Sequence, residues 1–312
     1  MALQFSVVIP LYNKAPHVEA AVASALAQTL PPSEVIVIDD GSTDGSDELV
    51  ARIDDPRVKL LRRSPPGPGG YAARNLGIEA ARSEWVIFLD ADDAWHPNHL
   101  QTLADTLAAS GPGVDCAFTG VTLVYSDRRR SRRMWAGFDS PGRPLSFATM
   151  LRGWLETGEC PLWTGACAFR RQTLFDAGLF PAGRALRGGD KDLWLRVMAR
   201  TRCAYSGQET AEFHQETVNR VSNFTSHSDL PIIVGTIREM IGSAPPDVAA
   251  LLRRLVNLEI VAYARHSAGR GRPYFSRFAR RLYYPVGMSS LAKVAGYFAA
   301  GLAIGGVQRF RT

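Results

Sequence analysis

The chain has 312 residues, of which 46% are hydrophobic and 21% are charged, and its formal net charge is +6. This composition is ordinary for a soluble globular protein, and the length is sufficient for one large domain with a small appendage. The four cysteines form no Cys-x-x-Cys pair, which argues against a disulfide framework or a structural zinc site and favours a reducing cytoplasm. The first residues, MALQFSVVIP, lack the basic and apolar regions of a signal peptide, so we expect them to lead into a strand.

The first hundred residues alternate predicted strands with predicted helices. Apolar runs predict buried strands over residues 5–11, 34–39, 57–61 and 85–90. Helical spacing of apolar residues predicts helices over 18–26 and 71–81, and the turn DDGSTDGS is suited to cap a further helix. This alternation predicts a parallel sheet with right-handed crossovers, and ligands of such sheets bind at the carboxyl ends of the strands.

The pattern changes after residue 110. Longer, mixed strands are predicted over 116–125 and 161–169, on either side of an arginine-rich turn at 128–133 that we interpret as a solvated surface loop. Helices are predicted over 172–177, 190–200 and 230–266, and residues 273–307 form a separate basic and apolar tail.

The segment FLDADD (88–93) is the strongest chemical signal. An apolar strand leads directly into Asp90, Asp92 and Asp93, and like charges this close are unfavourable unless a cation compensates them. Carboxylates are the ligands that Mg²⁺ and Mn²⁺ prefer, so Asp90 and Asp92 at a strand end predict a metal that bridges to a diphosphate. The alternative is an Asp-rich helix cap before Pro97.

Two further segments place polar residues at the same predicted edge. In VIDDGSTDGS (37–46), Asp39 ends a strand and is placed to accept from a base N–H or a ribose hydroxyl, although a tight turn would use the same residues. In YAARNLGIEAA (71–81), Arg74 lies near the start of a helix, where both the arginine and the helix N-terminus favour phosphate. The preceding PPGPGG matches neither a dinucleotide fingerprint nor a Walker A loop.

Taken together and in order, VVIPLYNK, VIDDGSTDGS, AARNLGI and FLDADD resemble the inverting family-2 glycosyltransferases. GDKDLWLR (189–196) and AEFHQETVNRVS (211–222) resemble later segments of that family, so the resemblance covers roughly residues 5–222. It implies an α/β GT-A fold, in which helices flank a Rossmann-like, mostly parallel central sheet. It further implies a catalytic domain over 1–225, with a nucleotide-binding half (1–110) and an acceptor-binding half (111–225), and a helical C-terminal extension over 226–312.

The resemblance also implies roles for single residues on the donor side. Asp39 would bind the nucleotide base, Arg74 would lie beside the diphosphate, and Asp92 would be the more direct metal ligand of the Asp-x-Asp pair. His214 would be a third metal ligand or a phosphate contact, with a structural histidine as the alternative. The nucleotide-sugar-binding set comprises Pro10, Tyr12, Asn13, Asp39, Asp40, Arg74, Asp90 and Ala91.

Asp190 is the predicted catalytic base, because it keeps the position of the second acid in the family's Glu-Asp pair. This chain departs from the pattern at Gly189, which replaces the first acid. Asp192 is the fallback base, and a helix N-cap is the structural alternative for Asp190.

The implied reaction is a single displacement that depends on Mn²⁺ or Mg²⁺. A sugar would move with inversion from a nucleotide-diphosphate sugar, with a UDP-sugar favoured, to a hydroxyl of a saccharide or lipid-linked saccharide in surface polysaccharide or glycolipid synthesis. Two rival functions stay open. A sugar nucleotidyltransferase lacks its expected glycine-rich, lysine-bearing first loop here, whereas Gly189 keeps a non-catalytic nucleotide-sugar-binding or scaffold protein in view.

The C-terminal stretch is strongly basic. We expect a segment that lies on the membrane surface at the inner face of the cell membrane, and the alternative is helices packed on the domain or on a partner subunit, including a second copy of the chain. Nucleic acid is not expected as a partner, because no recognition module accompanies the charge. The cations concerned are Arg265, Arg270, Arg272, Arg277, Arg280, Arg281, Lys293, Arg309 and Arg311.

Overall fold

The computed structural model describes residues 3–218, 230–270, 278–284 and 288–309. The chain forms two compact units. The first comprises Met1–Gly153 and Cys160–Asn223, and the second comprises Trp154–Glu159 and Phe224–Thr312. The expected boundary at 225/226, like Arg272, Arg277 and Arg311 of the basic stretch, lies outside the described residues.

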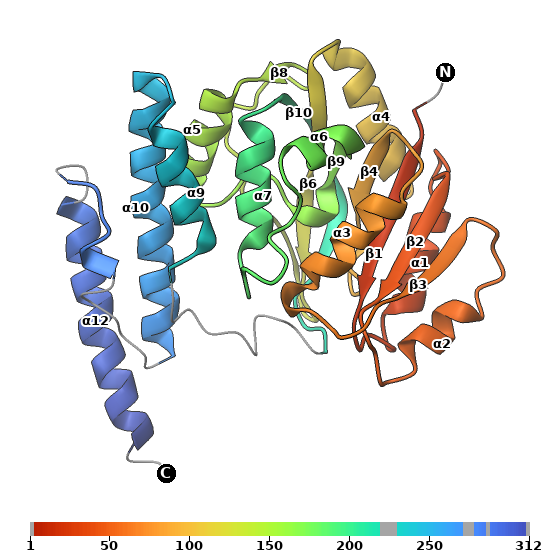
Figure 1. Ribbon diagram of the computed structural model, residues 1–312, viewed down its shortest axis with the longest axis horizontal. Helices are drawn as coiled ribbons and strands as arrows, with labels where there is room; N and C mark the ends of the chain where they lie inside the picture. Colours follow the sequence, from red (N-terminus) through yellow and green to blue (C-terminus); the bar gives the residue numbers. More distant parts are fainter. Residues whose placement is uncertain (1–2, 219–229, 271–277, 285–287, 310–312) are drawn as a thin grey trace. The chain divides into compact units, whose positions relative to one another are not determined.

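The N-terminal half of the first unit is a four-stranded parallel sheet in the order β3-β2-β1-β4 (Figure 1). Its strands are mostly apolar, and β1, β2 and β4 are buried along almost their whole length because helices cover the sheet. The strands are β1 (Phe5–Leu11), β2 (Glu34–Asp39), β3 (Val58–Arg62) and β4 (Trp85–Phe88). The helices are α1 (Val18–Leu26), α2 (Ser46–Ala51) and α3 (Tyr71–Ala80), and α3 follows a 3₁₀ turn, η1 (Pro68–Gly70).

Helix α3 packs closely on β1 because Gly77 has no side chain. A Cβ atom at Gly77 would lie 2.3 Å from Cγ1 of Val8. This close approach fixes the position of α3, and with it the position of Arg74, over the central strand of the sheet.

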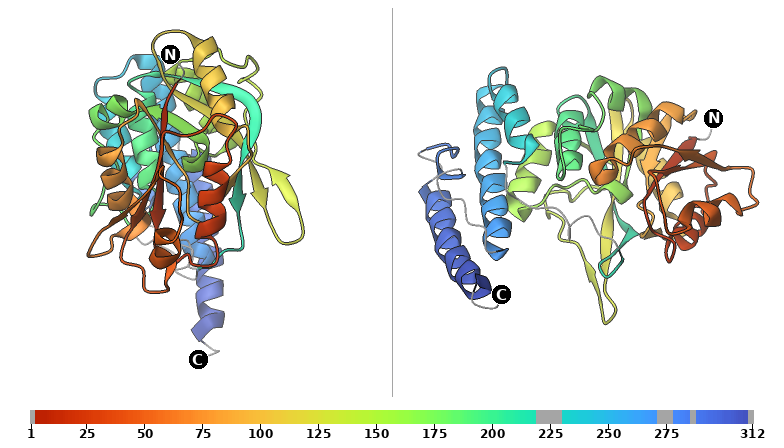
Figure 2. Two further views of the ribbon diagram at one scale, coloured as in Figure 1. Left: turned by 90° about the vertical axis from the view of Figure 1, so that its right-hand side faces the viewer. Right: turned by 60° about the horizontal axis from the view of Figure 1, so that its bottom comes forward.

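The sheet continues beyond β4 in the order β4-β9-β6-β10-β5. Strand β9 is antiparallel to both neighbours, whereas β6 and β10 run parallel to each other. Two short strands pair at the margins, β7 with β6 and β8 with β10, and the β6–β7 hairpin projects from the sheet (Figure 2). The strands are β5 (Ala94–Trp95), β6 (Val114–Val124), β7 (Arg129–Ser131), β8 (Pro144–Leu145), β9 (Cys167–Arg170) and β10 (Arg202–His214). The helices are α4 (His99–Ser110), α5 (Phe147–Thr157), α6 (Arg171–Asp176) and α7 (Gly189–Met198).

Two sequence-based predictions of secondary structure need correction. The strand predicted over 161–169 begins only at Cys167, because residues Thr164–Ala166 form a 3₁₀ turn, η2, whose Gly165 carbonyl accepts the indole N–H of Trp95 at 2.7 Å. The stretch predicted to be helical over 230–266 is helical but interrupted, and forms α9 (Ile232–Ile241) and α10 (Pro246–Gly269). Consecutive prolines, Pro245 and Pro246, cannot continue a helix, so α10 starts afresh there.

The second unit is helical. Helix α12 (Met288–Arg309) and helix α9 both pack against α10. Over residues 288–304 of α12, where burial is described, Val294 and Gly301 are the buried positions, and they lie on one face of the helix. Among the helices that the structure describes, none is long and apolar enough to cross a membrane.

Candidate functional site

Three parallel strands bring their carboxyl ends to one edge of the sheet. Leu11 at the end of β1 pairs in register with Asp39 at the end of β2, and the amide of Leu89, just after β4, donates to the carbonyl of Val8 on β1. The segments that follow these strands carry the predicted donor-side residues, so the topology brings together side chains that are up to eighty residues apart.

The loops after β1 and β2 are joined by hydrogen bonds. Asn13 adopts a left-handed backbone conformation with φ of 51°, its amide donates to Ser42 Oγ at 3.0 Å, and its side-chain oxygen accepts the Thr43 amide at 2.8 Å. Asp39 is buried and accepts the Ser42 amide at 3.1 Å, while Tyr12, which precedes Asn13 in the sequence, is 45% exposed. The loops therefore form one continuous surface at the end of the sheet.

Asp40 points into the protein and holds the glycine-rich loop. It is 2% exposed, pairs with the guanidinium of Arg63 and accepts the amide of Gly67 at 3.0 Å. The geometry gives Asp40 the role of an anchor for the loop that leads into α3.

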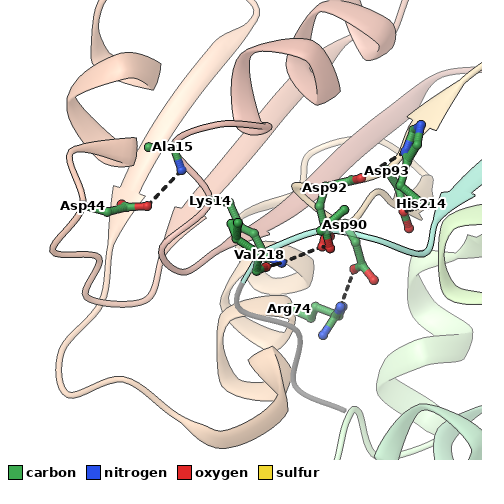
Figure 3. A network of polar contacts seen from close by, with 10 residues as sticks. Lys14, Ala15, Asp44, Arg74, Asp90, Asp92, Asp93, His214 and Val218 are labelled. Atoms are coloured by element: carbon green, nitrogen blue, oxygen red, sulfur yellow. Dashed lines mark hydrogen bonds and ion pairs between the residues drawn. The ribbon is translucent and has the colours of Figure 1, made fainter. Parts of the chain in front are cut away.

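Arg74 reaches from the first turn of α3 to the carboxylate of Asp90. Its Nη2 lies 2.5 Å from Asp90 Oδ1, and its Nη1 donates to the carbonyl of Gly69 at 2.9 Å (Figure 3). Burial by itself lowers the pKa of Arg74, but the charge and hydrogen bond of Asp90, together with the charge of Asp190, raise that pKa above its usual value. Arg74 is therefore a buried cation that is paired with Asp90, one of the predicted functional carboxylates.

Asp92 is held by two groups that sequence analysis did not assign. Lys14 Nζ and Thr217 Oγ1 each lie 2.5 Å from Asp92 Oδ2, and Lys14 also donates to the carbonyl of Val218 at 2.6 Å (Figure 3). The segment after β10 thus closes on the loop after β1 through this carboxylate. The side chains of Lys14 and Asp92 are 12% and 15% exposed, so this pair is largely shielded from water.

Asp93 reveals an excess of negative charge at this edge. It is buried, and its pKa is raised well above the usual value by burial first and then by the charges of Asp90 and Asp92. Its carboxylate accepts the backbone amide of His214 at 2.9 Å, which ties the end of β10 to the Asp-x-Asp segment.

The imidazole of His214 is turned toward the protein backbone. Its Nδ1 lies 3.1 Å from the main-chain carbonyl of Asp92, and its Nε2 lies 3.8 Å from Oε2 of Glu212. Figure 3 shows the Asp90 and Asp92 carboxylates extending instead toward Arg74 and Lys14. The three predicted metal ligands are therefore not gathered as one set, and no group of three or more His, Cys, Asp or Glu side chains suited to a metal occurs in the described part of the chain.

Two oxygen donors still fit a hard divalent ion. Mg²⁺ is commonly held by one or two carboxylates, with the other positions taken by substrate phosphates and water. Asp90 and Asp92 offer those carboxylates at the strand end, and Arg74 and Lys14 neutralise them in the structure. A site with this charge balance is suited to exchange its ammonium partner for a metal cation.

Asp190 lies in the first turn of α7 and is partly exposed. Asp192 is 2% exposed and forms an ion pair with Arg196, whose Nη2 lies 2.8 Å away, so the fallback base is buried and already paired. Gly189 fits against the ring of Tyr71, and its amide donates to the Tyr71 hydroxyl at 2.9 Å. The glycine that departs from the family pattern at position 189 therefore leaves the space that the ring of Tyr71 occupies.

The arginine-rich turn is only in part the solvated loop expected from the sequence. Arg128 and Arg130 are exposed, but Arg132 is 6% exposed, donates to the carbonyl of Cys160 at 2.6 Å and lies over the ring of Trp163. An alternating strand pattern after the turn could have indicated that one arginine points inward.

The sequence assigns no role to Lys14 or Thr217, for different reasons. Lys14 directly follows Tyr12 and Asn13 after the first strand, so the strand-end argument places it at this edge of the sheet without indicating what it binds. Thr217 is 125 residues from Asp92, and nothing in the local pattern signals their contact.

Known proteins resemble this chain in sequence. The model of the family described as "Glycosyl transferase family 2" matches residues 6–178, more than half of the chain. The succinoglycan biosynthesis protein ExoO of Rhizobium meliloti is 41% identical over 126 residues, which is 40% of this chain and 35% of that protein. The uncharacterized glycosyltransferase YibD of Escherichia coli is 37% identical over 147 residues, 44% of this chain and 42% of that protein. The matches thus span less than half the length of these relatives.

Solved structures share the fold at low sequence identity. Residues 1–349 of S. aureus TarS, in complex with UDP-GlcNAc, superimpose with a TM-score of 0.65 at 16% identity, covering 96% of this chain and 82% of that one. The mannosyltransferase PcManGT of Pyrobaculum calidifontis, in complex with GDP-Man and Mn²⁺, gives 0.58 at 20% identity, covering 97% and 87%. The predicted GT-A fold is confirmed, and with the family match the chain is a member of glycosyl transferase family 2.

Proposed function

We propose that this chain transfers a sugar, with inversion, from a nucleotide-diphosphate sugar to an acceptor hydroxyl, and that a UDP-sugar is the favoured donor. The observation that carries the proposal is the convergence at one sheet edge of Asp39, the Arg74–Asp90 pair and the Lys14–Asp92 pair. The TarS and PcManGT structures are complexes with UDP-GlcNAc and GDP-Man, which supports a nucleotide-sugar donor here.

The donor side divides into a base pocket and a diphosphate site. Asp39 would accept from the nucleotide base or ribose, on the surface that Pro10, Tyr12 and Asn13 form with the loop after β2. Arg74 would meet the diphosphate, since a guanidinium at a helix start pairs readily with phosphate oxygens.

Asp90 and Asp92 would hold Mn²⁺ or Mg²⁺ through their carboxylates, and Ala91 between them would line the nucleotide-sugar site. When bound, the ion supplies charge neutralisation for the nucleoside diphosphate that leaves. His214 would stabilise the position of these aspartates without binding the metal. Its ring nitrogen contacts the main-chain carbonyl of Asp92, and its amide donates to the Asp93 carboxylate. The Mn²⁺ in the PcManGT complex supports the choice of metal.

Asp190 would remove the proton from the acceptor hydroxyl as it attacks the anomeric carbon. It is partly exposed at the start of α7, and its charge contributes to the raised pKa of Arg74. Asp192, in contrast, forms an ion pair with Arg196. One base without a nucleophile gives inversion in a single displacement.

The acceptor would be a saccharide or a lipid-linked saccharide, in surface polysaccharide or glycolipid synthesis. The similarity to a succinoglycan biosynthesis protein supports this class. A lipid-linked acceptor requires the enzyme to work at the inner face of the membrane.

The helical unit offers a surface for that location. Residues 260–312 contain nine Lys and Arg residues and no Asp or Glu, and the described cations Arg265, Arg270, Arg280, Arg281 and Lys293 are exposed. The exposed positions of α12 include Met288 (65% exposed), Leu302 (56% exposed) and small alanines. Apolar side chains beside cations are suited to a membrane surface of anionic lipid, which we propose as the partner of this unit.

A donor screen tests the proposed reaction. Thermal stability would be measured with UDP-, GDP- and dTDP-sugars, each with and without Mn²⁺, because a ligand that binds only the native state raises the melting temperature by mass action. We expect UDP-sugars to give the largest shift, and only with the metal. Equal shifts without Mn²⁺, or none with any nucleotide sugar, would contradict the proposal.

A further inference from the structure

The ring of Tyr71 fills a space bounded by two glycines. Tyr71 is the first residue of α3 and is 5% exposed. A Cβ atom at Gly69 would lie 2.6 Å from Cε2 of Tyr71, and a Cβ atom at Gly189 would lie 2.8 Å from its Cζ. Neither distance is compatible with a side chain, so both positions must be glycine while the ring remains where it is.

The ring is also fixed on its face and at its hydroxyl. It stacks on Phe180, with centroids 5.9 Å apart and an interplanar angle of 14°. The hydroxyl oxygen accepts the backbone amide of Gly189 at 2.9 Å, and this hydrogen bond is buried. Tyr71 therefore has little freedom to move without moving the start of α7.

This hydrogen bond serves an otherwise uncapped helix start. The first amides of a helix have no partner within the helix, and a side chain at the N-cap usually satisfies one of them. The N-cap of α7 is Gly188, in a left-handed conformation, and it offers no such side chain. Tyr71, from a different helix, supplies the missing acceptor, and Asp190 is the next residue along α7.

One short stretch of α3 thereby holds two parts of the site. Tyr71 fixes the amide that precedes Asp190, and Arg74, one turn later, holds Asp90. The close packing of Gly77 on Val8 keeps both residues in place over β1.

We propose that Tyr71 is a positioning residue that sets the location of Asp190 relative to the bound donor. The inference rests on the proposed function, because it assigns Asp190 as the base. The two residues depend on each other in this chain. The absence of a side chain at Gly189 leaves room for the ring of Tyr71, and the hydroxyl of Tyr71 accepts the amide of Gly189.

The Tyr71→Phe variant tests this, because it keeps the ring and its stacking and removes only the hydroxyl oxygen. Hydrogen exchange of the Gly189 amide, measured by NMR on the full chain, should become about tenfold faster, the effect of losing roughly 1.4 kcal/mol of protection. The rate of UDP release from UDP-GlcNAc with Mn²⁺ and a saccharide acceptor should fall roughly 10–100-fold in kcat with little change in the donor KM. Unchanged exchange of the Gly189 amide would overturn the proposal, whatever the activity.

A double-mutant cycle separates this inference from the proposed function. Tyr71→Phe should have no further effect on kcat in an Asp190→Asn background, because the group it positions is already gone. A fully additive loss would reject the positioning role. If Asp190→Asn alone keeps the wild-type rate, the proposed base fails, but the exchange experiment still decides whether Tyr71 holds α7. Tyr205→Phe, which removes the hydroxyl of a tyrosine stacked on Phe118, is the matched control and should leave both readouts unchanged.

Discussion

Lys14 Nζ lies 2.5 Å from Oδ2 of Asp92, so an ammonium group occupies the oxygen that the proposed metal would use. Under the proposed function, a metal ion that binds there would have to replace this contact, and we expect Lys14 then to pair with the donor's diphosphate. The lysine would therefore compete with the metal in the donor-free protein and assist donor binding once the metal is bound.

Lys14→Met should make Mn²⁺ bind more tightly to the donor-free protein. Removing the competing cation should improve the dissociation constant by about tenfold, equivalent to 1.4 kcal/mol, as measured by calorimetry. The affinity for UDP in the presence of Mn²⁺ should fall, because a phosphate partner is lost.

The control is Lys59→Met, which removes a lysine paired with Glu34 at the other end of β2. Weaker Mn²⁺ binding to Lys14→Met than to wild type would show that the lysine supports the metal site instead of competing with it.

Asp190→Asn and Asp192→Asn should separate chemistry from stability. Loss of a positioned base typically costs ~10²–10⁴-fold in rate, so Asp190→Asn should lose transfer and keep donor binding. Asp192→Asn leaves Arg196 largely buried without its ion pair, and should cost about 3 kcal/mol of unfolding free energy. Steady-state kinetics and urea unfolding of both variants provide the comparison, and the reverse pattern would exchange the two assignments.

His99 predicts a pH dependence of stability. Burial, and then the charge of His96, lower the pKa of His99 from 6.5 to about 3, while its Nδ1 lies 2.7 Å from Thr210 Oγ1 and its ring stacks on Trp95. The unfolded chain takes up a proton near pH 6.5 and the folded chain does so only near pH 3. The stability due to neutral His99 is therefore complete above pH 6.5 and is lost as pH falls through this window, by about 1.4 kcal/mol per pH unit.

His99→Gln should reduce stability at pH 7 and flatten its decline between pH 6 and pH 4, as followed by urea unfolding. The exposed His266 offers the control, since His266→Gln should leave the slope unchanged. A wild-type slope in His99→Gln would contradict the lowered pKa.

The helical unit should bind vesicles that contain phosphatidylglycerol, and binding should weaken as salt rises. Each cation near an anionic surface contributes about 1 kcal/mol, so Arg280→Gln with Arg281→Gln should weaken partitioning about 30-fold in a flotation assay. Arg130→Gln with Arg133→Gln removes the same charge from exposed positions in the catalytic unit and should change partitioning little. Equal losses of vesicle partitioning for the two double variants would show that net charge alone, and not the position of the cations, determines binding.

The sequence predicts best those features that depend on position along a strand. The positions of Asp39, Asp90 and Asp92 at one edge of the sheet could be predicted, because polar residues at the carboxyl ends of parallel strands meet there. The strands themselves are predicted from unbroken apolar runs. Contacts between distant segments could not be predicted in this way. The closure of Thr217 on Asp92 and the fit of Tyr71 against Gly189 depend on how separate elements pack, which no local pattern encodes.

The GDKD segment illustrates the same limit. Gly189 alone suggests that an acid has been lost, and this kept a non-catalytic function in view. The structure shows that the space is used by an aromatic ring whose hydroxyl bonds the helix start. The meaning of a substitution at one position therefore depended on a residue 118 positions earlier.

The hydrogen bonds that join Asn13 to Ser42 and Thr43 have a consequence for selectivity among nucleotides. A base that docks on these loops meets a surface ordered before it arrives, so little conformational entropy is spent on shaping the pocket. Under the proposed function, discrimination between uracil and guanine would then depend on complementarity with these ordered loops, and changing the preferred nucleotide would require reshaping both loops together.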